Sequence, residues 1–303
     1  MIRVLPLRLT FEPESGVHLP AFPGAIWRSA FGARLRRDAC ITGADRCDGC
    51  SVRQRCAYGA VFEPIPTPQS QGLSQRFRDL PRPYVISPVH RGGFYGAGQR
   101  LSLDLILTAP AFGHLKAAER AFSRLHIHGT PMRLVEAQMR SPQASDGSPE
   151  DASIDANGYN IVIPAVPETV RVVLEHPLRL RRDNRNVGTE TFRADTFFSA
   201  LLRRLSSLYE AANSEPMDVN YRRLLDHARE HIRLDDTRLA WIDAERHSSR
   251  QARNVPIGGV VGSFTLTGNL EPLWPWLWVG QWTHVGKGAV MGLGRYRLDQ
   301  FAV

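Results

Sequence analysis

The chain has 303 residues, of which 43% are hydrophobic. It can therefore bury a substantial core, in one large domain or in two of ordinary size, and a disordered chain is excluded as the first interpretation. The formal net charge is +8 and the pI is about 9.8. This excess of positive charge favours a polyanionic partner over a small neutral substrate.

Arginine supplies nearly all of the positive charge. Of the 38 basic residues only Lys116 and Lys287 are lysines, so 36 are arginines. The planar guanidinium group binds phosphate through two parallel hydrogen bonds and stacks on bases, which suits RNA. Genomes rich in G and C also encode arginine in place of lysine in all of their proteins, so the high ratio of arginine to lysine has two explanations. The net charge remains the stronger argument for a nucleic-acid partner.

The sequence predicts neither a membrane span nor a signal peptide. It contains no stretch of about 18 apolar residues. Residues 1–13 alternate apolar with polar side chains instead of forming one continuous apolar segment. We therefore expect a cytoplasmic protein that makes no membrane contact.

The first half of the chain predicts strands and helices in alternation. Residues 2–11 alternate as a strand does, whereas residues 20–37 have helical periodicity and an unusually basic surface. The segment near 39–90 contains the cysteines and many prolines, and we interpret it as an insertion without a long regular element. A strand, a helix and a strand are predicted next, at residues 100–108, 114–125 and 132–139. Residues 141–158 are predicted to be a surface loop or linker.

The second half repeats this order with a different sequence. The predicted elements are a strand at 169–174 that continues through 180, a long helix around residues 197–208, a strand at 259–267, a Trp-rich helix at 270–282 and a strand at 290–298. The charge-dense residues near 212–246 are interpreted as a helical insertion. The predicted fold class is therefore α+β, with two βαββαβ domains in tandem at residues 1–150 and 160–303.

A glycine-rich loop at residues 284–295 is the most specific motif. Its candidate binding residues are His284, Gly286, Lys287, Gly288, Gly292, Gly294 and Arg295. Glycines allow backbone N–H groups to approach a phosphate chain without obstruction by Cβ atoms. The spacing differs from that of a nucleotide P-loop and from that of a dinucleotide-binding fingerprint. The alternative is that these glycines serve only a tight turn before the last strand.

This loop resembles the C-terminal glycine-rich loop of the CRISPR-associated endoribonucleases that process precursor RNA, members of the RAMP superfamily. The run 284–298, HVGKGAVMGLGRYRL, carries the resemblance. Residues 246–251, RHSSRQ, agree with the same family, as do residues 256–262, PIGGVVG. The order of the cysteines and of the following residues to Glu63 is similar to a cysteine-bearing branch, of which the type IV variant is one candidate. The resemblance covers most of the chain and is strongest from 168 to 303.

The resemblance implies two ferredoxin-like (RRM-like) domains that bind the repeat hairpin of precursor CRISPR RNA and cut it once. The implied chemistry needs no metal ion: the RNA 2′-OH attacks the neighbouring phosphate and leaves a 2′,3′-cyclic phosphate. A base, an acid and groups that stabilise the phosphorane are then required. The implied partners are CRISPR repeat RNA, the mature CRISPR RNA to which the enzyme stays bound, and other CRISPR effector subunits.

This sequence differs from the family in the residue that would carry the proton during cleavage. Many relatives use a histidine on or near the first helix, but the helix predicted here has none, and the nearest, His18, precedes it. We therefore expect Arg28, Arg36 and Arg37 to orient phosphate and stabilise charge, with His18 as the proton carrier. The alternatives are arginines on a solvated helix face and a loop histidine. Further RNA contacts are expected from Arg246, Arg250 and Arg253.

The four cysteines fall within 17 residues, at Cys40, Cys47, Cys50 and Cys56. In a reducing compartment such a cluster indicates metal before disulfides. Four thiolates at short spacing can enclose one tetrahedral Zn²⁺ of structural type. An iron–sulfur cluster uses the same ligands. The remaining alternative is a set of reduced cysteines that bind nothing.

Two rival functions follow from the same observations. A non-catalytic CRISPR RNA-binding subunit of an effector complex has the same fold, and the missing helix histidine favours it. A metal-stabilised DNA-binding regulator would require a recognition helix and dimer symmetry, and the sequence indicates neither.

The tryptophans of the Trp-rich helix either stack on RNA bases or belong to the hydrophobic core. Trp274, Trp278 and Trp282 share one helical face, as core residues do.

Overall fold

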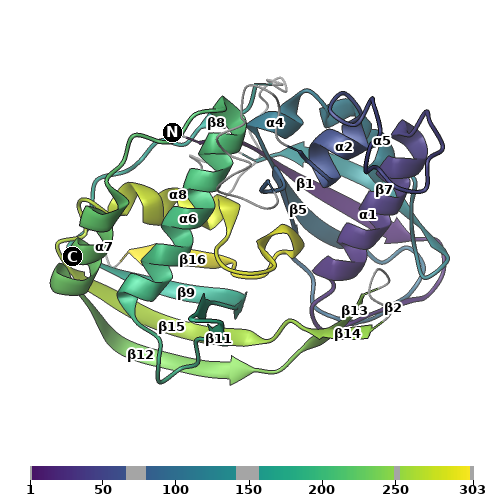
Figure 1. Ribbon diagram of the computed structural model, residues 1–303. Coiled ribbons are helices and arrows are strands. Elements are labelled where there is room, and N and C mark those ends of the chain that lie inside the picture. The colour runs from purple at the N-terminus through teal and green to yellow at the C-terminus, as the bar shows by residue number, and fades with distance from the viewer. Residues whose placement is uncertain (1, 66–79, 141–156, 249–252, 301–303) are drawn as a thin grey trace. The chain divides into compact units, whose positions relative to one another are not determined.

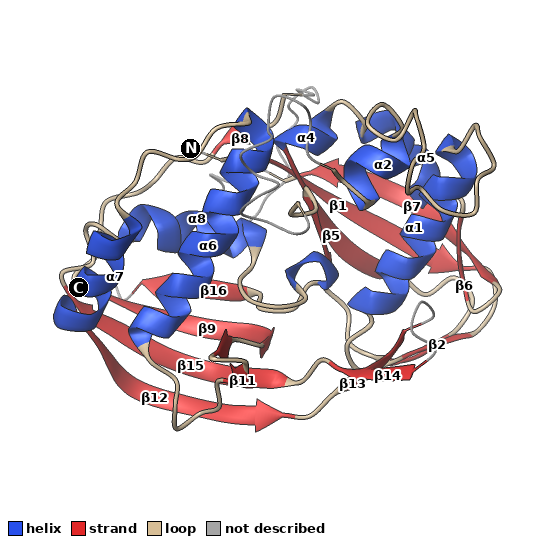
Figure 2. Cartoon of the chain, in the orientation of Figure 1, coloured by secondary structure: helices blue, strands red, loops and turns tan. Residues whose placement is uncertain are grey.

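The computed structural model describes residues 2–65, 80–140, 157–248 and 253–300. The chain divides into two compact units, Met1–Val162 with Ser207–Pro216, and Ile163–Ser206 with Met217–Val303 (Figure 1). In each unit an antiparallel sheet carries helices, so the fold is α+β as predicted (Figure 2).

The first unit is built on a sheet with the strand order β3-β5-β1-β7-β6. Its strands are β1 (Arg3–Pro13), β3 (Tyr84–Pro88), β5 (Leu101–Thr108), β6 (Leu125–Ile127) and β7 (Thr130–Met139), and β8 (Tyr159–Asn160) pairs with the start of β1. All neighbouring strands are antiparallel. Helix α1 (Gly24–Ala39) follows β1 and helix α5 (Leu115–Phe122) follows β5. The order β1-α1-β3-β5-α5-β7 is therefore the ferredoxin-like βαββαβ unit.

Aromatic side chains attach the two helices to this sheet. Phe31 of α1 stacks on Phe122 of α5 with the ring centroids 4.5 Å apart, and Trp27 of α1 lies 4.8 Å from Phe11 of β1. All four side chains are fully buried. Burying a large apolar side chain stabilises the fold by about 1.5–3 kcal/mol relative to its exposure. These contacts therefore fix the position of α1, which carries three candidate site residues.

Strand β3 was missed in the sequence, because its residues were included in the insertion near 39–90. All five residues from Tyr84 to Pro88 are buried, and they pair with β5. Strand β3 lies at the edge of the sheet, where a proline costs no ladder hydrogen bond. The prolines therefore border a real strand, which completes the βαββαβ unit.

The second unit has a four-stranded sheet of order β12-β15-β9-β16. Its strands are β9 (Thr169–Leu178), β12 (Ile232–Ile242), β15 (Gly259–Gly268) and β16 (Tyr296–Gln300), covered by α6 (Ala194–Asn213) and α8 (Trp274–Thr283). Phe197 of α6 makes T-shaped contacts with Phe264 of β15 and Tyr296 of β16, each at 5.6 Å between centroids. If these four strands are numbered along the chain, their order across the sheet is second, third, first, fourth. Strands β3, β5, β1 and β7 of the first unit have the same order. Both halves are therefore ferredoxin-like.

Two predictions about this half were wrong. The region near 212–246 was expected to be a helical insertion, but it contains helix α7 (Tyr221–His231) followed by strand β12. Most of β12 is exposed and four of its eleven residues are charged, as is common in edge strands, and this composition hid the strand. The last strand was expected at 290–298 but begins at Tyr296, because a short 3₁₀ helix (Ala289–Met291) and the turn at Gly292 precede it.

Shorter elements complete the two units. They are β2 (Val17–Leu19), α2 (Ala57–Phe62), β4 (Gly93–Tyr95), α4 (Ala109–Phe112), β10 (Arg181–Arg182), β11 (Arg185–Asn186), β13 (Glu245–Ser248) and β14 (Arg253–Pro256). Three two-stranded pairs result, β2 with β4, β10 with β11 and β13 with β14. Among the residues that the structure describes, no helix is both long and apolar enough to span a bilayer.

Candidate nucleic-acid interface

The glycine-rich loop has a shape that only glycine permits. It follows α8, and Gly286, Gly288, Gly292 and Gly294 all have positive φ angles between 65° and 84°. At Gly294 a Cβ atom would lie 1.8 Å from the carbonyl oxygen of Val285. The glycines therefore allow the backbone of the loop to turn tightly, which is the role that the turn alternative assigned to them.

Hydrogen bonds attach this loop to the end of β9. The N–H of Lys287 donates to the carbonyl of Arg179 at 2.9 Å, and the N–H of Gly294 donates to that of Pro177 at 3.0 Å. The Nδ1–H of His176 donates to the carbonyl of Gly292 at 2.8 Å. These bonds fix the loop backbone, and with it the place of the Lys287 side chain.

Four cations gather where the loop meets β9 and α6. Arg179, Arg181 and Arg203 all act on Lys287, and their charges, together with the larger effect of desolvation, lower its pKa. None of these four side chains forms an ion pair with a carboxylate of the described residues. Arg179 and Arg181 donate instead to the backbone carbonyls of Pro256 and Asn184, which leave their charges unneutralised. Uncompensated positive charge of this kind binds phosphate.

Arg295, at the end of the loop, is already neutralised. Its Nε lies 2.6 Å from a carboxylate oxygen of Glu175, and Arg297 approaches the same carboxylate at 3.4 Å. Arg295 was predicted to bind RNA, but its charge is shared with this acid. It therefore contributes less to an anion site than the four-cation cluster of Arg179, Arg181, Arg203 and Lys287.

His284 does not reach the surface. Only 2% of the residue is exposed, and its Nδ1 has no hydrogen-bond partner among the described residues. Burial, with Arg295 and His176 nearby, holds its pKa well below the usual value for histidine. The predicted RNA contact is therefore excluded for this side chain, which stays neutral beneath the loop. Beside it, burial lowers the pKa of Arg204 to about 10.

The remaining predicted RNA-binding arginines belong to another part of this unit. Arg246 lies on β13 and Arg253 on β14, the two strands of one hairpin, in which Arg253 pairs with Ser248. Arg250 lies outside the described residues. The hairpin thus brings Arg246 and Arg253 onto adjacent strands.

The three arginines of α1 differ in their surroundings. The guanidinium of Arg28 lies 4.3 Å from the ring centroid of Phe62, in a cation–π contact. Arg36 donates to the carbonyl of Ala44 at 2.6 Å and also to that of Asp45. Arg37 is exposed. The contacts of Arg28 and Arg36 favour structural roles, and Arg37 is the arginine of the three that solvent reaches most easily.

His18 lies on the two-stranded sheet β2–β4. It is exposed and stands opposite Phe94 in the register. Phe94 is 71% exposed, and its ring packs against Gly16, where a Cβ atom would lie 2.7 Å from it. An accessible histidine beside an accessible aromatic ring can reach a polynucleotide.

The four cysteines lie around one small cavity of about 20 Å³. The hydroxyl of Thr42 is 3.7 Å from the sulfur of Cys40 and 3.8 Å from that of Cys50. Hydrogen bonds, first from Thr42, lower the pKa of Cys40, whereas burial raises that of Cys47. All four thiols are free, and within the described chain no three His, Cys, Asp or Glu side chains are arranged as metal ligands.

Three cluster residues were absent from the sequence-based site: Arg179, Arg181 and Arg203. A signal for two of them existed in the run 176–182, HPLRLRR, because residues 179 and 181 are two apart and so project on the same side of an extended chain. Arg203 is on α6, far from the loop in sequence, and only folding brings it close.

Comparison with known proteins finds two family models that match parts of the sequence. Residues 2–152 match a family model described as an N-terminal domain, and residues 172–296 match the model of the CRISPR-associated endoribonuclease Cas6. No curated protein matches the sequence at a significant level.

Solved structures of similar fold extend over the whole chain. Thermus thermophilus Cas6 is 16% identical with a TM-score of 0.57, over 99% of each chain. A Cas6-related protein from Pyrococcus furiosus is 10% identical with a TM-score of 0.54, over 99% of this chain and 100% of that one. A chain of a partial Cas6-RT-Cas1–Cas2 complex is 13% identical with a TM-score of 0.60, over 99% of this chain and 46% of that one. Residues 172–296 therefore match the CRISPR-associated endoribonuclease Cas6 family, within a chain that has the fold of these Cas6 structures throughout.

Proposed function

We propose that this protein binds the repeat hairpin of precursor CRISPR RNA and cleaves it. The observation that carries this proposal is the four-cation cluster on the glycine-rich loop, in the segment that matches the Cas6 family. The cations have no carboxylate partner among the described residues, so a polyanion is the ligand that best satisfies them. The net charge of +8 acts in the same direction.

The proposed chemistry is attack of the RNA 2′-OH on the adjacent phosphate, without a metal ion, to give a 2′,3′-cyclic phosphate. The cluster would stabilise the charge of the phosphorane. Lys287 is also suited to protonate the leaving 5′ oxygen, because its lowered pKa makes its ammonium group a stronger acid than an ordinary lysine. His18, which belongs to the first unit and is the accessible histidine nearest to α1 in sequence, stays the sequence-based candidate for proton carrier.

Retention of the product is part of the same proposal. Cleavage leaves every other phosphate of the hairpin in place, so the contacts with the cluster would persist and the mature CRISPR RNA would dissociate slowly. The enzyme could then present it to other CRISPR effector subunits. The alternative function is a non-catalytic CRISPR RNA-binding subunit, which would use the same cluster.

The test is to incubate the full chain with repeat RNA from the neighbouring CRISPR array in excess EDTA. A single cut beside the hairpin with a 2′,3′-cyclic phosphate end supports the proposal. The Lys287→Gln variant should bind more weakly and cleave more slowly, whereas Lys116→Gln, an exposed lysine on α5, should match the wild type. Tight binding without any cut would support the binding-subunit alternative instead.

We also propose that the four cysteines hold one structural Zn²⁺. They line one cavity, but no three of them are arranged as metal ligands, so binding would require their thiols to move toward one another. Arg36 and Arg46 line the same cavity, and their charge would offset that of four thiolates. Elemental analysis of the purified protein should give about one zinc per chain, and Cys50→Ser should release it. Iron with visible absorbance would indicate an iron–sulfur cluster, and protein free of both metals would refute the proposal.

A further inference from the structure

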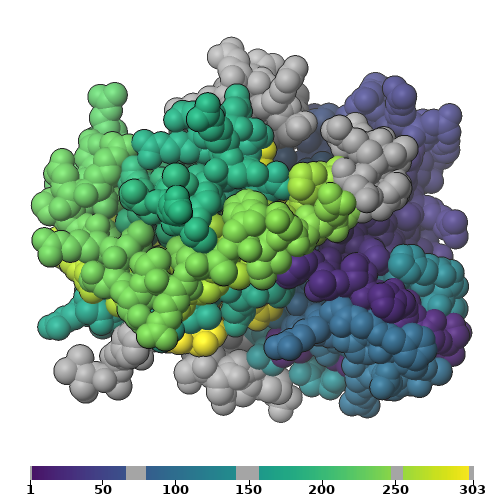
Figure 3. Space-filling view, turned by 90° about the horizontal axis from the view of Figure 1, so that it is seen from below, coloured from purple at the N-terminus to yellow at the C-terminus, as the bar shows by residue number. Residues whose placement is uncertain are grey.

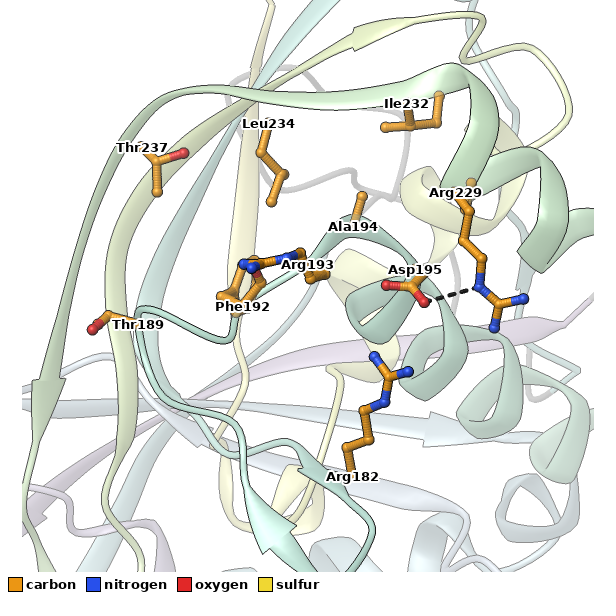
Figure 4. A pocket seen from close by; sticks show the side chains of 11 residues that line it. Arg182, Thr189, Phe192, Arg193, Ala194, Asp195, Arg229, Ile232, Leu234 and Thr237 are labelled. Atoms are coloured by element: carbon orange, nitrogen blue, oxygen red, sulfur yellow. Dashed lines mark hydrogen bonds and ion pairs between the residues drawn. The ribbon is translucent and has the colours of Figure 1, made fainter.

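A cavity of about 610 Å³ lies in the second unit, beside the four-cation cluster. Residues of β10, of the start of α6 and the segment before it, of the end of α7 and of β12 line it (Figure 4). The space-filling view shows the teal part of the chain next to the green part, which includes α7 and β12 (Figure 3). Its volume is in the range of small-molecule sites.

One wall of this cavity is apolar. Phe192 and Ile232 line it and are 3% and 6% exposed, so both are held firmly by the core. Leu234 of β12 is half-buried and lines the same cavity. A flat aromatic ligand gains most from rigid apolar walls of this kind, because they lose no freedom when it binds.

A fixed acceptor lies in the same cavity. Asp195 is in the first turn of α6, with its side chain 14% exposed, and Arg229 holds one carboxylate oxygen at 3.1 Å. The hydroxyl of Thr196 donates to the other oxygen at 3.4 Å, a weak bond. A carboxylate oriented in this way can accept hydrogen bonds from the amino groups on a nucleobase edge.

Arg182 supplies a cation at the mouth of the cavity. Its side chain is 60% exposed, and its ion pair with the exposed Asp183 is at 4.0 Å, so that pair contributes little. Figure 4 shows its guanidinium directed toward the side where Asp195 and Arg229 lie. Arg193, in contrast, donates to the carbonyls of Glu190 and Phe192. Arg182 is therefore the lining arginine best placed to bind a phosphate.

The hairpin connects this cavity to the four-cation cluster. Arg181 and Arg182 are consecutive on β10, and consecutive side chains of a strand project to opposite faces. Arg181 acts on Lys287 of the cluster, whereas Arg182 lines the cavity. An RNA strand crossing the hairpin would thus meet a phosphate site on one face and a pocket with one apolar wall on the other.

We propose that this cavity holds one unpaired base of the bound RNA, turned inward, while the adjoining phosphates lie on Arg182 and on the cluster. The inference rests on the proposed function and adds a specificity site to it. Unpaired bases are the part of RNA that proteins read most readily, by stacking and by hydrogen bonds to their edges. The site would therefore distinguish the repeat from other hairpins of similar charge.

The test combines a protein variant that fills the cavity with RNA that lacks one base. Repeat RNAs with a single abasic nucleotide at each unpaired position are measured against wild type, Leu234→Trp and Arg182→Gln. One abasic position should raise the Kd of wild type about tenfold, as loss of one stacked base does. Leu234→Trp should raise the Kd of intact RNA to a similar degree, and the two changes together should cost no more than either alone. Arg185→Gln, on the same hairpin but outside the lining, should leave the Kd unchanged.

The outcomes separate the two proposals. If wild type binds no repeat RNA, the proposed function and the base site both fail. If wild type binds and cleaves, but the folded Leu234→Trp and Arg182→Gln variants bind intact RNA as wild type does, only the base site is refuted. Additive losses in the combination of Leu234→Trp with the abasic RNA would refute it as well.

Discussion

Replacing Lys287 by Gln should change how RNA binding depends on salt. The lysine stands among Arg179, Arg181 and Arg203, none of which forms an ion pair with a described carboxylate. Each phosphate that a cation neutralises releases condensed counterions, and this release sets the slope of log K against log salt. Gln keeps most of the side-chain length and removes the charge, so the variant isolates one such contact.

The expected magnitude follows from the number of charges. Each neutralised phosphate contributes about 0.7 to the slope for single strands and about 0.9 for a duplex, so four contacts give a slope of about −3. Lys287→Gln should make this slope shallower by about 0.7–0.9. Between about 50 and 200 mM salt, the affinity of the variant should then fall about threefold less than that of wild type.

The assay is fluorescence anisotropy with a repeat RNA that cannot be cut, carrying a 2′-deoxy substitution at the cleavage site, over a series of salt concentrations. Lys116→Gln is the matched control, because it removes the same charge from an exposed position on α5. An unchanged slope for Lys287→Gln, or an equal change for Lys116→Gln, would refute the phosphate site at the glycine-rich loop.

Three further predictions concern the fold and its titration. Gly294→Ala should destabilise the protein by about 1–3 kcal/mol, because a Cβ atom would meet the carbonyl of Val285 at 1.8 Å, whereas Gly113→Ala, with open space around it, should have little effect on the Tm. The pKa of His284 is lowered in the folded protein, so below about pH 6.5 the imidazole is protonated in the unfolded chain and stays neutral in the folded one. The stability of the protein should therefore fall as the pH falls. His284→Asn removes this effect and should lose less Tm than wild type between pH 7 and pH 5. Arg36→Gln should decrease the rate at which a thiol reagent modifies the cysteines, because the charge of Arg36 favours the reactive thiolate form of Cys40 and Cys47; a rate equal to that of wild type, or above it, would contradict this.

Sequence patterns identified the elements whose residue types follow a regular spacing along one segment. The alternation of apolar and polar residue types in β1 and the apolar stripe of α6 are local properties of the sequence, and both elements are present close to the expected residues. The glycine-rich loop was also recognisable, because positive φ angles favour glycine and four glycines of the loop adopt them. Local patterning therefore sufficed for the fold class.

Edge strands were not recognisable in this way. Strand β3 is bordered by prolines, and β12 is mostly exposed with four charged residues, so neither alternates clearly. Each is a strand because a neighbour, β5 or β15, supplies its hydrogen bonds. This pairing joins residues far apart in the chain, and no local pattern records it.

The sequence by itself determined the family resemblance, the net positive charge and the loop in which Lys287 lies. Only the tertiary structure decided which cations surround Lys287, since Arg203 comes from α6 and Arg179 from the end of β9. It also decided that His284, adjacent to the loop in sequence, lies inside the core. The physical reason is that charge and burial depend on distances in space, which the fold sets by packing helices on a sheet.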